Sequence, residues 1–224
     1  MPAPAVSTLI AKASNTTAMK QFSEACIQNR EPILSVLRET FAAARHVLEI
    51  GSGTGQHAVY FSRHLPHLRW QTSDLEENHA GINAWLHEAA LNNTLPPFTL
   101  NVTDVSWTES TPESTYDGVF SANTTHIMSW PAVQEMFTGI GKLLETDARF
   151  CLYGPFNYNG SYTSDSNRRF DIWLKERNPA SGIRHFEALN ELALLNGMRL
   201  ETDFEMPVNN RLLVWKKQQP CHVV

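Results

Sequence analysis

Apolar residues in the first part of the chain change from helical spacing to the spacing of a buried strand. Over residues 17–44 they recur every three or four positions, which predicts helix, and Pro32 divides this segment into two helices. An apolar run over residues 47–50 is typical of a parallel strand covered on both faces. Helical spacing then resumes over residues 54–65. We therefore expect an N-terminal helical cap over residues 1–44, loose in its first 15 residues, followed by a β–α unit.

Strand and helix patterns continue to alternate along the rest of the chain. Further strands are predicted at residues 68–73, 98–102, 116–123, 149–153, 199–207 and 211–216. Further helices are predicted at residues 78–92, 131–144, 168–177 and 182–196. This order predicts an α/β fold with a mostly parallel sheet, and the short link between the last two strands suits an antiparallel hairpin. We expect one domain over residues 1–224.

A glycine-rich turn joins the first strand to the helix that follows it. Glycines at positions 51, 53 and 55 can take positive φ and let the backbone approach a ligand closely, although a plain tight turn is the alternative. The dinucleotide fingerprint G-x-G-x-x-G places its third glycine one position later, where this chain has Gln56. Glu49 precedes the turn, where a carboxylate would repel a pyrophosphate and attract an ammonium group.

The E-x-G-x-G-x-G spacing resembles motif I of class I S-adenosylmethionine (SAM) methyltransferases. By this resemblance five residues are expected to lie against the methionine and ribose of SAM, namely Glu49, Gly51, Ser52, Gly53 and Gly55.

Acidic residues at the ends of the second and third strands are the next cofactor candidates. Asp74, with Leu75 after it, lies about 20 residues beyond the glycines, the offset that places a carboxylate on ribose hydroxyls. Alternatively Asp74 caps the following helix. The third strand ends beside adenine in this fold, so we expect Asp104 and Val105 near that ring, unless Asp104 caps a turn.

Polar side chains follow the fourth strand, over the crevice where open α/β sheets bind ligands. Asn123 is expected to contact the cofactor, and His126 is expected to be a catalytic base that titrates near neutrality, although a lone histidine is as often structural. Arg30, at the predicted break in the N-terminal helices, either faces the cofactor or is solvated.

Aromatic and amide side chains are concentrated after the fifth strand. Tyr153, Asn157 and Asp171 are expected to orient a methyl acceptor. Phe156 and Tyr158 would offer stacking faces to a small, partly polar substrate, unless this loop packs its aromatic rings on the sheet.

Composition narrows the function. The chain has 224 residues, of which 42% are hydrophobic and 18% charged, which suits one globular domain and argues against disorder. The net charge of −5 disfavours a nucleic-acid partner. Three cysteines lie far apart, so the spacing predicts no metal site and no need for an oxidising compartment. No signal pattern or membrane-spanning run is apparent, and we expect a cytoplasmic protein with no membrane partner.

Several segments together resemble one small methyltransferase-like family of bacteria and animals, formerly called a domain of unknown function. They are Glu49–Gly55, Trp70–Asp74, Asn123–Trp130, Tyr153–Phe156 and Thr163–Asp171. The resemblance implies a Rossmann-like class I methyltransferase fold, with a seven-stranded sheet whose last strand inserts between the fifth and sixth, and SAM as cofactor. It implies no settled substrate.

The sequence thus predicts a SAM-dependent methyltransferase of a small-molecule acceptor, active as a monomer or homodimer. The alternatives are a non-catalytic protein or partner subunit that binds SAM or S-adenosylhomocysteine (SAH), a protein methyltransferase, and a nicotinamide oxidoreductase on a related fold. Gln56 and Glu49 count against the last of these.

Overall fold

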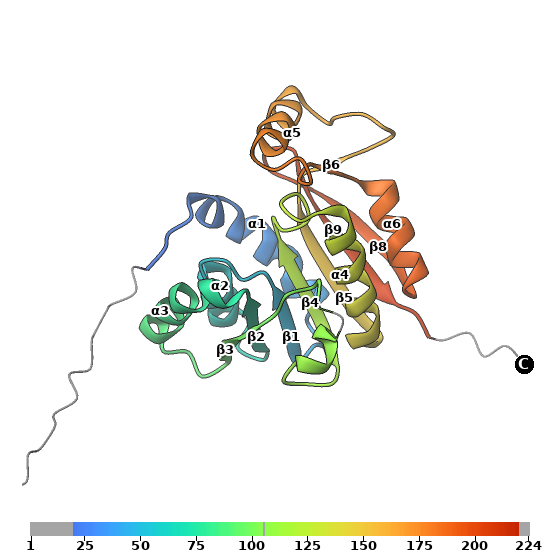
Figure 1. Cartoon of the computed structure of the whole chain (residues 1–224). Helices are drawn as coiled ribbons and strands as arrows, with labels where there is room; N and C mark the ends of the chain where they lie inside the picture. The colour runs from blue at the N-terminus through green and yellow to red at the C-terminus, as the bar shows by residue number, and fades with distance from the viewer. Residues whose placement is uncertain (1–19, 105, 220–224) are drawn as a thin grey trace, which may run out of the picture.

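The computed structural model describes residues 20–104 and 106–219, and these contain a seven-stranded sheet of order β3-β2-β1-β4-β5-β9-β8 (Figure 1). Its strands are β1 (His46–Ile50), β2 (Arg69–Asp74), β3 (Thr94–Thr99), β4 (Tyr116–Ala122), β5 (Leu144–Gly154), β8 (Met198–Met206) and β9 (Asn210–Lys217). The first five are parallel, and β9 runs antiparallel to both of its neighbours. The predicted α/β class, mostly parallel sheet and antiparallel C-terminal hairpin are confirmed.

Helices cover both faces of the sheet. One face carries α1 (Glu24–Thr40), α2 (Gln56–His64) and α3 (His79–Ala89), and the other carries α4 (Trp130–Leu143) and α6 (Phe186–Leu195). Each layer buries its own apolar cluster against the sheet, which accounts for the continuous apolar runs of the central strands. A sixth helix, α5 (Asp165–Arg177), lies beyond the end of the sheet, near the short strands β6 (Phe156–Asn157) and β7 (Arg184–His185) (Figure 1).

The N-terminal segment forms one helix, so the predicted break near residues 29–31 is wrong. Helix α1 runs from Glu24 to Thr40 with Pro32 inside it. Proline in a helix interior costs about 3 kcal/mol. The fully buried side chains of Ile33 and Leu37 lie on the following turns, and each such burial contributes about 1.5–3 kcal/mol. Together these contributions outweigh the loss at Pro32, and the helix continues.

The third strand begins earlier than predicted. β3 covers Thr94–Thr99 instead of residues 98–102, and it contains Pro96 and Pro97. Proline lacks the N–H that a central strand must donate, but it is tolerated at a sheet edge. β3 is the edge strand, and its register with β2 shifts opposite the two prolines.

Three other boundaries differ from the prediction. α6 begins at Phe186 instead of residue 182, because residues 184–185 pair with β6 and Gly182 has a φ of +150°. α5 begins at Asp165 instead of residue 168, where the Ser164 hydroxyl accepts a hydrogen bond from the Asn167 N–H. β5 starts at Leu144 instead of residue 149.

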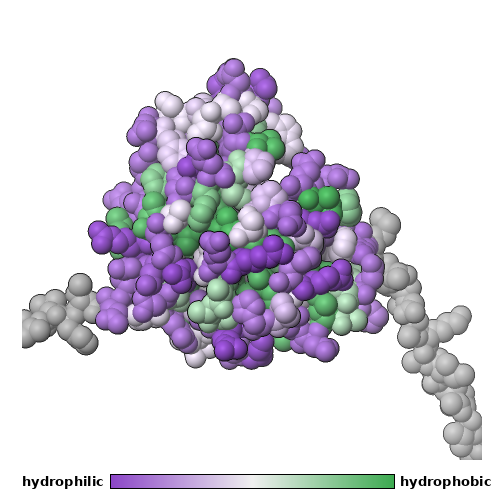
Figure 2. All heavy atoms as spheres, turned by 180° about the vertical axis from the view of Figure 1, so that it is seen from behind, coloured by the Kyte–Doolittle hydropathy of each residue, from purple (hydrophilic) through white to green (hydrophobic). Residues whose placement is uncertain are grey.

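Figure 2 shows the molecule from behind, where apolar residues appear in separate groups between hydrophilic ones. Within the described ranges, none of the helices combines the length and the apolar character that a membrane span requires. The expectations for residues 1–15 and for Val105 fall outside the described residues.

Candidate functional site

A cavity of about 560 Å³ lies where β1, β4 and β5 end. Because parallel strands end at one edge of the sheet, the segments that follow these three strands meet there. The remaining walls come from α1, from the first half of α5 and from the turn between β8 and β9. Six predicted site residues line it: Gly51, Ser52, Gly53, Asn123, His126 and Tyr153.

The glycine turn has the backbone conformation that its sequence predicts. Gly51, Gly53 and Gly55 have φ values of +74°, +57° and +85°. A Cβ added at Gly53 would meet nothing within 4 Å, so this residue borders open space in the cavity. A Cβ added at Gly55 would lie 3.1 Å from the Ile82 Cα. Gly55 therefore permits close packing of α2 on α3, and only the first two glycines line the cavity.

Asp74 holds the glycine turn in place. Its Oδ2 accepts a hydrogen bond of 2.7 Å from the Gly53 N–H. Its Oδ1 accepts bonds of 2.7 Å from the Leu75 N–H and from the Asn78 amide. The carboxylate thus anchors the loop and bonds to the turn after β2. The alternative that it caps the following helix is wrong, because Leu75 and Asn78 are the N-cap residues of the two helices that follow and neither helix has a side-chain cap bond. Asp74 is buried and does not line the cavity itself.

Glu49 is the next-to-last residue of β1, directly before the glycine turn. Its side chain is 2% exposed, and its Oε2 accepts a bond of 3.0 Å from the Trp70 indole N–H. Burial raises the pKa of this carboxyl to about 7, against the opposing effect of hydrogen bonds from Trp70 and Ser52. The charge of Asp74 raises it further. A cation bound nearby would favour the ionised form of this carboxyl.

His126 faces the cavity as a neutral imidazole. It is 6% exposed, and burial lowers its pKa to about 4, with the charge of Arg184 acting in the same direction. Its titration therefore lies well below neutrality, unlike the sequence-based expectation. A Cβ placed on Gly154 would be 3.9 Å from the His126 Nδ1 and 4.0 Å from the Asn123 Oδ1. The two polar groups therefore converge at the end of β5.

Tyr153 adds a hydroxyl to the same wall. Burial raises the pKa of its phenol, and hydrogen bonds with Asn29 and Asn210 partly oppose this. The hydroxyl stays protonated at neutral pH and is available as a donor. Asn29 comes from α1 and Asn210 from the start of β9, so Tyr153 lies where two walls of the cavity meet.

Two parts of the cavity were not predicted as site residues from the sequence. The His57 Nε2 lies 2.7 Å from the Asn29 Oδ1, and burial, aided by the charge of Arg30, lowers the pKa of His57 to about 4. Its position in the first turn after the glycines was an available signal, because that turn faces the ligand crevice. The other unpredicted part is the turn at Pro207 and Val208, which the sequence marks only as a hairpin link.

Besides Glu49, Gly55 and Asp74, three described residues that were predicted to bind the cofactor lie outside the cavity wall. Arg30 stacks its guanidinium 4.4 Å from the centre of the Tyr60 ring, because in a continuous helix the neighbour of the inward-facing Asn29 points away. Leu75 is 41% exposed, and Asp104 is exposed with its Oδ1 3.4 Å from the Asn101 amide. Val105 falls outside the described residues.

The two remaining acceptor candidates are buried behind the cavity. The Asp171 carboxylate accepts bonds of 2.7 Å from the Ile183 N–H and the Tyr162 hydroxyl, and pairs with Lys175 at 2.7 Å. It therefore ties α5 to the segment before β7. Asn157 is 4% exposed in β6, and its Oδ1 has no partner among the described residues.

The aromatic rings near β6 pack on the protein, as the alternative to substrate stacking anticipated. Phe156 is fully buried in the apolar core. Tyr158 stacks on Phe186 with ring centres 5.1 Å apart and donates its hydroxyl to the Asp203 Oδ2 at 2.8 Å.

Several of the solved structures with a similar fold are described as O-methyltransferases. An O-methyltransferase family protein from Burkholderia thailandensis is 16% identical with a TM-score of 0.75, over 88% of this chain and 58% of that one. The mitomycin 7-O-methyltransferase MmcR is 14% identical with a TM-score of 0.73, over 86% and 54%. A structure described as PigF with SAH is 13% identical with a TM-score of 0.69, over 84% and 55%. This chain spans a little over half of each, and the likeness shows that the fold is methyltransferase-like.

A family model covers nearly all of the described residues. It matches residues 20–217, from just before α1 to the last residue of β9, and so includes the glycine turn and every wall of the cavity. The chain belongs to the family described as "Protein of unknown function (DUF938)".

Proposed function

We propose that this protein is a SAM-dependent methyltransferase that acts on a small-molecule acceptor. One observation carries the proposal: the open glycine turn and the polar groups of Asn123, His126 and Tyr153 face the same cavity at the carboxyl ends of the parallel strands. The methyltransferase-like fold of the solved structures supports it. The cavity of about 560 Å³ falls within the usual 300–1,000 Å³ of small-molecule sites.

The residues present fit SAM. Gly53 leaves open space where a ligand can approach the backbone, and the buried Glu49 carboxyl suits an ammonium group. Asp74 lies behind the cavity wall, so it would act on the ribose through the Gly53 backbone that it holds in place. The exposed side chains of Leu75 and Asp104 would be available to the adenine outside this wall. When bound, SAM would supply a methyl group that its sulfonium already makes electrophilic.

The protein then has to align the acceptor, exclude water and accept a proton. Alignment of two bound reactants can supply about 7–11 kcal/mol of the barrier. The neutral His126 ring would accept the proton of the attacking group, while the Tyr153 hydroxyl and the Asn123 amide would hold the acceptor. Asp171 and Asn157 act as positioning residues, since they lie behind the wall that carries these groups.

One observation favours a second function, the binding of SAM or SAH without catalysis. A pKa of about 4 makes His126 a weak base at neutral pH, because general bases work best with a pKa near the operating pH. Turnover with any acceptor would exclude this function, while SAH binding is common to both.

A matched pair of glycine variants tests the cofactor assignment. We expect wild-type protein to bind SAH in a calorimetric titration, and Gly53→Ala to weaken binding at least tenfold by filling the open space with a methyl group. Gly160→Ala is the control, since Gly160 also has positive φ (+73°) and no neighbour within 4 Å of an added Cβ, but lies outside the cavity wall. It should bind SAH like wild type. Failure of wild-type protein to bind SAH would refute the proposal.

A further inference from the structure

The turn between β8 and β9 has a strained backbone at the mouth of the cavity. Its two central residues, Val208 and Asn209, have φ values of +61° and +58°, and the Asn210 N–H lies 3.4 Å from the Pro207 carbonyl oxygen. Positive φ at both central positions defines a type I′ turn, which favours Asn-Gly. A β-branched residue such as valine is a true outlier in this conformation.

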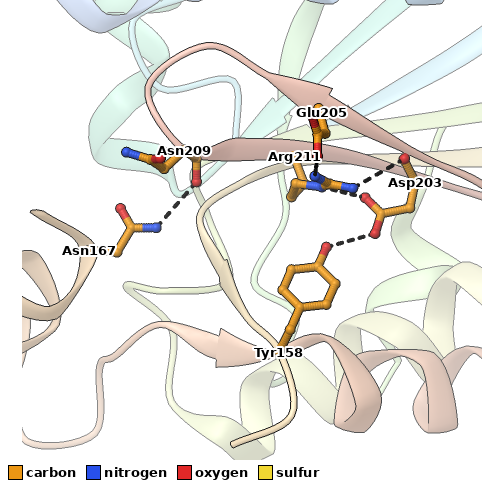
Figure 3. A network of polar contacts seen from close by, with 6 residues as sticks. All are labelled: Tyr158, Asn167, Asp203, Glu205, Asn209 and Arg211. Atoms are coloured by element: carbon orange, nitrogen blue, oxygen red, sulfur yellow. Dashed lines mark hydrogen bonds and ion pairs between the residues drawn. The ribbon is translucent and has the colours of Figure 1, made fainter. Parts of the chain in front are cut away.

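The surroundings hold this turn in place. The Asn167 side-chain amide donates to the Asn209 carbonyl oxygen at 3.2 Å, and the Asn209 amide donates to the Ser166 hydroxyl at 3.4 Å. Figure 3 shows the first of these contacts beside a second network lower on the hairpin. There Arg211 pairs with Asp203 at 2.8 Å and with Glu205 at 2.9 Å. Strain persists only where the surrounding structure determines the backbone in this way, and it is concentrated at ligand sites.

The strained residue gains little burial in return. Val208 is 75% exposed although its side chain is apolar, and it lines the cavity together with Pro207 and Phe170. A turn that served only to reverse the chain would be more stable with glycine at this position. The side chain of Val208 would become buried if an occupant of the cavity lay against it.

The cavity wall also lacks charged side chains. Among the described residues that line it, there is no Asp, Glu, Lys or Arg. Its two histidines are neutral at pH 7, because burial lowers the pKa of each to about 4. A charged group on the acceptor would therefore lose its hydration without gaining a counter-charge from this wall, because the Glu49 carboxyl proposed for the ammonium group of the cofactor is buried and is not part of it. Amide and hydroxyl groups such as those of Asn29, Asn167 and Tyr153 remain to bind neutral polar groups.

We propose that the methyl acceptor is an uncharged molecule, and that Val208 is a specificity-determining residue that covers the apolar part of this acceptor at the cavity mouth. The inference rests on the proposed function, because it concerns the space that the cofactor leaves. The strained turn would select acceptors that carry an apolar part, and the uncharged cavity wall would reject acceptors that carry a charge.

Matched probe compounds test the selection against charge. SAH-saturated protein is titrated with three sets of compounds, built on phenol, cyclohexanol and pentanol. The three members of each set differ only in one substituent, which is a neutral hydroxymethyl, an anionic carboxylate or a cationic aminomethyl group. Binding is followed by ligand-observed NMR. We expect the neutral member of each set to bind at least tenfold more tightly than either charged member. A charged member that binds as tightly as the neutral one would overturn the inference, as would failure of every neutral member to bind.

A glycine variant tests the role of Val208 through two readouts that move in opposite directions. Val208→Gly should raise the thermal midpoint by about 2–4 °C, because the strain energy that it removes from the folded state is larger than the entropic stabilisation that it gives to the unfolded chain. The same variant should bind the neutral probes three- to tenfold more weakly. Leu195→Ala is the control, since Leu195 is 76% exposed, similar to Val208, but lies outside the cavity wall. It should leave probe binding unchanged.

The two proposals fail in different ways. If wild-type protein binds no SAH, the proposed function is wrong. If SAH binds with equal affinity to wild-type protein and Val208→Gly, and this variant binds the probes as wild type does, then only the role of Val208 is refuted.

Discussion

Removal of the Asp74 carboxylate should destabilise the protein even without ligand. The side chain accepts hydrogen bonds from the Gly53 and Leu75 N–H groups at 2.7 Å each, and a third from Asn78. A hydrogen bond to a charged group contributes about 1.5–3 kcal/mol. We count only the hydrogen bonds from the two backbone donors, at the lower limit of this range. The Asp74 side chain is 9% exposed, so water can take over part of its role as hydrogen-bond acceptor in the variant. Asp74→Ala should therefore lose about 3 kcal/mol of unfolding free energy.

Urea unfolding followed by tryptophan fluorescence measures this loss, since Trp70 is fully buried next to β1. The midpoint should fall while the slope stays constant, because the surface exposed on unfolding does not change. In a thermal scan the same loss corresponds to about 6–12 °C. SAH affinity should also fall at least tenfold, because the glycine turn that lines the cavity loses its anchor.

Asp117→Ala is the matched control. The Asp117 carboxylate also accepts two backbone hydrogen bonds of 2.7 Å, from Arg45 and His46, but near the start of β4, at the opposite end from the cavity. It should lose comparable stability and bind SAH like wild type. If Asp74→Ala loses less than about 1 kcal/mol while the control loses more, Asp74 does not hold the loop and the reasoning fails.

Four further predictions concern Glu49, His126 and Gly55. The pKa of Glu49 is about 7 in the folded protein and 4.5 ordinarily, so the contribution of its protonated form to stability is complete below pH 4.5 and is lost as the pH rises through 7. Glu49→Gln does not titrate, so its unfolding free energy relative to wild type should rise by about 3 kcal/mol between pH 4 and pH 8. Urea titrations at the two pH values measure this difference. His126→Ala should lower turnover about 100-fold in a radiolabelled methyl-transfer assay while SAH affinity stays within twofold, and equal losses would exclude a role in proton transfer. With a pKa of about 4, His126 should also produce no inflection in wild-type turnover between pH 6 and 8. Gly55→Ala should lower the unfolding free energy by about 1–3 kcal/mol, because the new Cβ would press on Ile82, and an unchanged thermal midpoint would contradict this packing.

The architecture was predictable because the helices and strands of each layer have characteristic patterns of apolar residues in the sequence. Strands buried on both faces appear as apolar runs, and a three-residue link leaves little choice but a hairpin. The continuity of α1 was not predictable from local rules, because Pro32 is outweighed by tertiary burial of Ile33 and Leu37. That error had a consequence for the site: in an unbroken helix Asn29 faces the cavity and Arg30 does not.

The candidate site was predictable where a residue directly follows a strand. Gly51 and Asn123 occupy such positions and Tyr153 is the next-to-last residue of β5, so the sheet brings the three together whatever their partners are. His57 was missed although its place in the first helical turn after the glycines was a local signal, whereas the place of Val208 in the cavity depends on contacts across the fold. The hydrogen bonds that hold the turn at Val208 come from α5, about 40 residues earlier, and no local pattern records them.

The position of β9 between β5 and β8 bears on how the chain folds during synthesis. β5 is complete at Gly154, but its antiparallel neighbour begins only at Asn210. At translation rates of about 5–20 residues per second, the edge of this central strand stays unpaired for roughly 3–11 s. Unpaired strand edges are templates for aggregation. A nascent chain of this protein thus exposes the edge of β5 to other chains until β9 has left the ribosome.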